Sequence, residues 1–153
     1  GADPVYAGSA TTVKRAISMR GVRARGIRIP QEERDRFNFV DFRRCELKNQ
    51  GSIEKLLDLN ARVEAAEIEM GNRAGYGIHY LEPYRGIDEN VDYDFVIMRH
   101  YYSAEMRSSI VTSSPSFREM MNKNGFYKEF RRYAKCGPES TFRVEWLYNS
   151  YQD

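Results

Sequence analysis

The stretch over residues 91–117 constrains the fold of this chain more than any other. It begins with an aromatic-rich run that is typical of a strand, and Ser103 then caps a helix. Ser114 and Pro115 open a second helical stretch, because proline is favoured at the first position of a helix. Residues 37–70 repeat the pattern of a strand followed by a capped helix. We therefore expect two strand–helix units in tandem.

Two more strands complete the predicted pattern. Residues 75–82 end at Pro83 and form a hairpin with 91–102, and residues 141–148 alternate Phe, Val, Trp and Tyr with charged side chains. The element order is β-α-β-β-α-β, which predicts a ferredoxin-like sandwich: a four-stranded antiparallel sheet with helices on one face. Aromatic residues occur on both faces of the predicted strands. We therefore expect a second copy of the chain to cover the open face.

Length and composition place the chain among ordinary globular proteins. Its 153 residues are 41% hydrophobic and 30% charged, enough for one domain with its own core. No apolar run is long enough to span a membrane. The chain starts with Gly1 rather than Met, which indicates a processed end and leaves the compartment open. Cys45 and Cys136 form no metal-binding or redox motif, and whether they pair is also open.

The positive charge is concentrated near the N-terminus. Residues 4–31 carry Lys and Arg without any Asp or Glu, although the net charge of the whole chain is only +2. We therefore divide the chain into a basic arm over 1–34 and an α+β domain over 35–153. Residues 19–29 alternate weakly, so they either add an edge strand or wrap a neighbour.

The hairpin GYGIHYLEPYRG and the following VDYDFVIMRHYYSAEMRSSIVTSSPSFREMM resemble the second half of the dimeric α+β barrel superfamily. The resemblance covers about residues 37–148 and rests on the order of elements and one loose Ser-Ala-Glu and Ser-Pro-aromatic pattern. It implies a homodimer with a pocket between sheet and helices in each subunit. It implies no particular reaction, because one fold hosts many functions.

Polar and aromatic residues of the predicted strands are the candidates for a site. The histidines suit proton transfer, and tyrosine combines a flat apolar ring with a hydroxyl group. Candidate catalytic residues are His79, Arg99 and His100; candidate ligand-binding residues are Arg43, Tyr76, Tyr80 and Tyr102. The two histidines differ in parity relative to any plausible turn, which predicts opposite faces of the sheet. Asp92 and Asp94 should share one face of the sheet, and whether Asp41 lies beside them is open. We interpret this face as a solvated surface or an interface and not as a carboxylate cluster.

Three functions remain open at this stage. The first is a dimeric α+β barrel that binds a small aromatic or polycyclic molecule, with no metal and no cofactor expected. Whether the protein also transforms this molecule is open. The second is an RNA-binding module, which the aromatic strands and basic arm favour and which Asp92 and Asp94 disfavour, because carboxylates repel phosphate. The third is a structural subunit whose arm wraps a partner. No phosphate-binding loop, nucleophile elbow or Cys-His pair is present.

Overall fold

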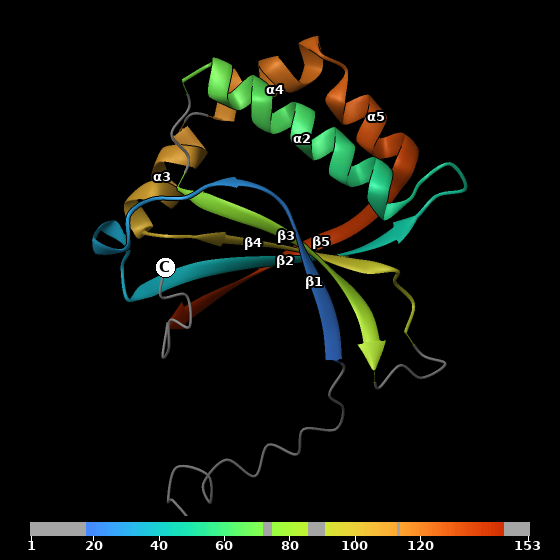
Figure 1. Cartoon of the computed structure of the whole chain (residues 1–153), viewed down its shortest axis with the longest axis horizontal. Helices are drawn as coiled ribbons and strands as arrows, with labels where there is room; N and C mark the ends of the chain where they lie inside the picture. Colours follow the sequence, from blue (N-terminus) through green and yellow to red (C-terminus); the bar gives the residue numbers. More distant parts are fainter. Residues whose placement is uncertain (1–17, 72–74, 86–90, 113, 146–153) are drawn as a thin grey trace, which may run out of the picture.

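The computed structural model describes residues 18–71, 75–85, 91–112 and 114–145. Five strands and four α-helices lie in this part of the chain, together with one 3-10 turn, η1 (Figure 1). In chain order they are β1 (Ser18–Ile27), η1 (Gln31–Glu33), β2 (Phe37–Leu47), α2 (Ile53–Glu69), β3 (Tyr76–Arg85), β4 (Phe95–Tyr101), α3 (Ala104–Thr112), α4 (Ser114–Lys123), α5 (Phe126–Tyr133) and β5 (Ala134–Glu145).

The strands form one antiparallel sheet in the order β1-β3-β4-β2-β5. The predicted four-stranded ferredoxin-like sandwich is therefore wrong, because the sheet has a fifth strand and the chain enters it with two strands before its first helix. The resemblance to the dimeric α+β barrel superfamily and the homodimer that it implies stay predictions. The additional strand is β1, which pairs with β3 from Ser18 to Ile27.

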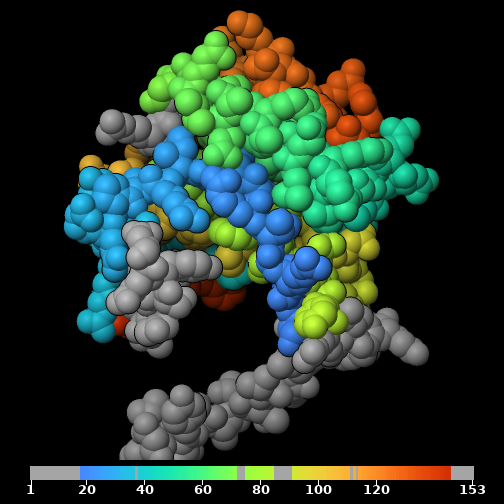
Figure 2. All heavy atoms as spheres, in the orientation of Figure 1, coloured from blue at the N-terminus to red at the C-terminus, as the bar shows by residue number. Residues whose placement is uncertain are grey.

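The sequence left two alternatives for residues 19–29, an edge strand or a segment that wraps a neighbour. The structure shows the edge strand, β1. Its apolar alternation is weak because its register with β3 shifts between Arg23 and Arg25, and because one of its buried side chains is Arg25 itself. In Figure 2, the atoms of β1 (blue) lie against α2 (green). The basic segment up to residue 17 lies outside the described residues.

Helices α2, α4 and α5 cover one face of the sheet (Figure 1). The predicted cap of the first long helix is confirmed, since the Ser52 hydroxyl accepts a hydrogen bond from the backbone N–H of Lys55 at 3.2 Å. The breaks predicted around Ser114 and near Gly125 separate α3, α4 and α5. Apolar side chains fill the space between α2 and the sheet and between α2, α4 and α5. None of the helices described here is long and apolar enough to cross a membrane.

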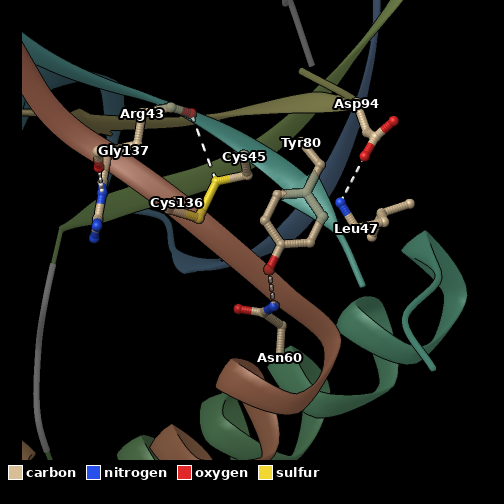
Figure 3. The surroundings of a disulfide bond; sticks show 8 residues. All are labelled: Arg43, Cys45, Leu47, Asn60, Tyr80, Asp94, Cys136 and Gly137. Carbon is tan, nitrogen blue, oxygen red and sulfur yellow. Dashed lines mark hydrogen bonds between the residues drawn. A yellow bond between two sulfur atoms is a disulfide. The ribbon is translucent and has the colours of Figure 1, made fainter. Parts of the chain in front are cut away.

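A disulfide joins the two strands at the end of the sheet where α5 leads into β5. Cys45 of β2 and Cys136 of β5 are direct neighbours in the register, with Cα atoms 4.1 Å apart (Figure 3). Both cysteines of the chain are used in this bond. The question that the sequence left open is answered by the strand pairing, which places them opposite each other.

The face of the sheet away from the helices carries aromatic rings. Phe142 of β5 is 53% exposed and meets Phe42 of β2 edge-to-face, with ring centroids 5.7 Å apart. The expectation that a second copy covers this face stays a prediction.

Candidate functional site

The alternation of side chains along β4 divides the sequence-predicted site residues between the two faces of the sheet. Arg99 and Tyr101 point toward the helices, whereas His100 and Tyr102 belong to the opposite face. The predicted residues on the helix side are Arg43, Tyr76, Tyr80 and Arg99, and those on the opposite side are His79, His100 and Tyr102. The candidate residues identified from the sequence therefore belong to two separate groups, one on each face of the sheet.

On the helix side, Tyr76 and Tyr80 belong to a buried network that joins β1, β3 and α2. Arg25 donates to Asn60 at 2.9 Å, to Glu67 at 2.6 Å and to the Tyr76 hydroxyl at 2.6 Å. Tyr76 also contacts Glu67 at 2.5 Å, and Asn60 contacts the Tyr80 hydroxyl (Figure 3). Burial raises the pKa of the Tyr76 hydroxyl, which therefore stays protonated. These groups satisfy one another, so the network connects α2 to the sheet.

A second polar group lies on the same face, toward α3, and is arranged differently. Asp41 is 2% exposed; one of its oxygens accepts from the Tyr101 hydroxyl at 2.9 Å and the other from Thr141 at 2.7 Å. Arg99 is opposite Asp41 in the register, and its Nη1 is 3.5 Å from the Tyr101 hydroxyl, the outer limit of a hydrogen bond. Both carboxylate oxygens of Asp41 are therefore already occupied by hydroxyl groups beside this arginine.

The charge of Arg99 is maintained in this position. Burial lowers the pKa of the guanidinium, but the nearby Tyr101, Glu139 and Asp41 outweigh it, and the pKa is raised. Burial also raises the pKa of the Tyr101 hydroxyl, against the effect of Arg99, so Tyr101 remains a protonated donor. The site therefore holds a permanent cation next to a hydroxyl that donates to Asp41.

Helix α3 brings a second guanidinium to the same place. Arg107 lies over the rings of Phe39 and Tyr101, with 4.9 Å and 5.8 Å from its Cζ to the ring centroids. Its Nε is buried and has no hydrogen-bond acceptor among the described residues. In the same part of the chain, no carboxylate lies within 4.0 Å of the guanidinium of Arg99 or of Arg107. Two arginines thus meet at Tyr101 without a close counter-ion.

A hollow of about 410 Å³ lies beside these residues, where β2, β5 and the start of α3 come together. Phe39 lines it and also packs against Arg107, so it connects the hollow to the arginine pair. The remaining lining residues are Asp35, Arg36, Asn38, Ala104 and Arg143. We call the group formed by Phe39, Asp41, Arg99, Tyr101, Arg107 and Thr141 the two-arginine site.

On the opposite face, the two histidines lie together, and the prediction that they occupy different faces is wrong. The rings of His79 and His100 are stacked with centroids 5.3 Å apart, and the ring of Tyr102 meets His100 edge-on at 5.1 Å. Gly77 makes room for this arrangement, because a Cβ at that position would lie 2.4 Å from the His100 ring. Burial lowers the pKa of His100 to about 4, with contributions from His79 and Arg34.

The pKa of His79 is also lowered, by burial first and then by Arg23 and Arg28. Both imidazoles are therefore neutral near pH 7, and Arg34, which lies over the Tyr102 ring at 4.8 Å, is the cation next to them. No three His, Cys, Asp or Glu side chains gather closely enough to hold a metal ion within the described ranges.

The other sequence candidates lie apart from both groups. Arg43 donates to the Gly137 backbone carbonyl at 3.0 Å across the β2–β5 edge (Figure 3). Asp94 accepts from the backbone N–H of Leu47 at 2.6 Å and is separate from the buried Asp41. A second hollow, of about 540 Å³, lies between β1 and α2 and is lined by Arg23, Gly26, Ile27, Arg28, Glu64 and Ile68.

Sequence reasoning missed Arg107 and Thr141 and undervalued Asp41. Arg107 is on a helix whose other residues give almost no amphipathic signal, and Thr141 is an ordinary strand residue. Asp41 was the one detectable signal, since a carboxylate at the centre of a Phe- and Val-rich strand needs a partner when it is buried.

The chain matches no protein-family model, no curated protein and no solved structure.

Proposed function

We propose that this protein binds a small organic anion with a flat apolar part, at the two-arginine site between the sheet and α3. The observation that carries the proposal is that Arg99 and Arg107 converge on Tyr101 with no carboxylate within 4.0 Å among the described residues. Partly buried cations are normally paired, so a pair of them without a counter-ion favours an anionic ligand.

The comparison with Arg25 supports this reading. Arg25 is buried on the same face of the sheet, and its guanidinium donates to Asn60, Glu67 and Tyr76 at 2.6–2.9 Å. Among the described residues, the one hydrogen bond of the Arg99 side chain is the 3.5 Å contact to the Tyr101 hydroxyl. Glu139 and Asp41 raise the pKa of Arg99, but neither carboxylate lies within 4.0 Å of its guanidinium.

The shape of the ligand follows from the neighbours of the cations. The guanidinium plane binds carboxylates through two parallel hydrogen bonds, so a carboxylate is the favoured anionic group. The rings of Phe39 and Tyr101 border the site, and such rings stack on flat organic groups. The expected ligand is therefore a small aromatic molecule, as the sequence indicated, but one that carries a negative charge. It binds at the two-arginine site and not beside the histidines.

Benzoate is the simplest probe, with benzamide as its uncharged counterpart. We expect saturable binding of benzoate in two-dimensional NMR titrations of the full chain, with much weaker binding of benzamide. R99M and R107M should each weaken benzoate binding on the order of tenfold or more, because a hydrogen bond to a charged group contributes about 1.5–3 kcal/mol. R99K should retain part of the affinity that R99M loses, since lysine keeps the charge and lacks the two-pronged geometry of arginine.

R44M is the matched control, because Arg44 is an exposed arginine of the same sheet that lies over Tyr93. It should bind benzoate like the original chain, and thermal melts should show that R99M and R107M remain folded. If benzoate does not saturate, or if folded R99M and R107M bind it as well as R44M does, the proposed function is wrong.

A further inference from the structure

Strand β5 forms one edge of the sheet, red in Figure 1. Residues 137–143 are all exposed, although the strand pairs with β2 along its length. An exposed edge strand offers a row of unpaired backbone groups to another chain. β5 is therefore an edge of the sheet that needs either a protective device or a partner.

The direction of the free backbone groups follows from two hydrogen bonds. The N–H of Lys48 donates to Tyr133 on the β5 side, and the carbonyl of Cys45 accepts from Asp94 on the β4 side. Backbone groups alternate along a strand, so the odd-numbered residues of β2 point toward β4 and the even-numbered residues toward β5. Asp41 and Thr141 are register partners, and they therefore form a pair without backbone hydrogen bonds.

It follows that the N–H and C=O groups of Thr141 point out of the sheet. The same holds for Glu139, Arg143 and Glu145, which are spaced by two residues along β5. Pro138 does not interrupt this row, because it has the other parity and lies where the register with β2 shifts, between Arg43 and Cys45. Proline is thus absent from the outward-facing positions of this part of the strand.

The side chains around Thr141 are complementary to themselves. Glu139 and Arg143 have opposite charges and lie two residues before and after it on the same face. None of the ion pairs among the described residues involves Glu139. In an antiparallel pair of identical strands centred on Thr141, each Glu139 stands opposite an Arg143.

We propose that β5 pairs antiparallel with β5 of a second copy of this chain, with the two-fold axis at Thr141. The two five-stranded sheets become one continuous sheet, held by the outward backbone groups and by two Glu139–Arg143 pairs. Phe142, which is 53% exposed, then lies diagonally across from its own copy on the face away from the helices. The proposed pairing uses the backbone groups of Thr141, whose hydroxyl donates to Asp41 within the two-arginine site, and it does not depend on what that site binds.

Cysteine cross-linking tests the register directly. T141C places two thiols on the axis, where the Cα atoms of a hydrogen-bonded antiparallel pair are about 5.5 Å apart, within the range of a disulfide. We expect T141C to form a covalent dimer under mild oxidation, seen on non-reducing gels. K135C is the control, because Lys135 is exposed on the same strand but far from its own copy in this register. Equal cross-linking of the two variants, or none by T141C, overturns the proposal.

Charge reversal tests the side-chain pairing without a new cysteine. E139R and R143E each place like charges opposite one another and should weaken the dimer at least tenfold, measured by sedimentation equilibrium at low salt. The double variant E139R/R143E exchanges the partners and should restore the dimer. A chain that is monomeric at all concentrations, or a dimer that none of the three variants changes, contradicts the proposed pairing.

Discussion

His79 and His100 stack on the face of the sheet away from the helices, with ring centroids 5.3 Å apart. Burial lowers the pKa values of both imidazoles, and the neighbouring His79 lowers that of His100 further. We therefore expect the pair to make the fold sensitive to acid.

We predict that His100 makes the protein less stable in acid. Its pKa falls from 6.5 in the unfolded chain to about 4 in the fold, so the fold favours the neutral imidazole. The stabilisation is complete above pH 6.5 and is lost as the pH falls toward 4, by at most about 3 kcal/mol. H100F keeps a ring over Gly77 without a proton to bind. Urea unfolding between pH 7 and 4 should show a smaller loss of stability for H100F than for the original chain; equal losses contradict the prediction.

We predict that Gly77 and His100 are energetically coupled. A Cβ at position 77 would lie 2.4 Å from the buried His100 ring, so G77A should cost about 1–3 kcal/mol of unfolding free energy. In the H100A background the ring is gone, and the same change should cost much less. G137A is the control, since its Cβ would meet nothing closer than the Arg44 carbonyl at 3.7 Å. Equal costs in both backgrounds would show that the ring does not cause the effect.

The positions of these histidines show where sequence reasoning stops. The strand over 37–47 and the Ser52-capped helix were readable because their patterns are local. Whether His79 and His100 share a face depends on the register of β3 against β4, and a shift of one residue reverses every side chain. That register is fixed by packing along the whole hairpin, which alternation within one strand does not record.

The missed strand β1 has a related cause. A sequence pattern identifies buried positions by their apolar residues, whereas β1 buries Arg25, 8% exposed, through partners that come from α2 and β3. The two-arginine site was hidden in the same way, because Arg107 of α3 and Asp41 of β2 meet only after the sheet and helices pack. Long-range ion pairs and hydrogen bonds leave no periodic signal in the chain.

We predict that the pair of Arg25 and Glu67 is essential to the stability of the fold. Their side chains are 9% and 3% exposed and lie 2.6 Å apart, so E67Q leaves a buried cation without its counter-ion. The expected loss in urea unfolding is about 3–5 kcal/mol. The double variant R25M/E67M should lose much less than the sum of its single changes. R23A breaks the more exposed pair with Glu64 and should cost no more than about 1 kcal/mol. A loss for E67Q as small as that for R23A contradicts the prediction.

We predict that the Cys45–Cys136 bond stabilises the fold chiefly by restricting the unfolded chain. The two residues are separated by 91 positions, and closing a loop of that length corresponds to about 4.6 kcal/mol in the chain-entropy model. The variant C45A/C136A should therefore lose about that much free energy of unfolding in urea titrations, and reductant should have no further effect on it. The same reductant should lower the stability of the original chain toward that of the variant.

Because β5 is paired only with β2 among the described strands, hydrogen exchange of β5 should increase more than that of β3 when the bond is removed. Uniform exchange in the two strands would show that the bond stabilises the sheet as a whole and does not act mainly on its edge.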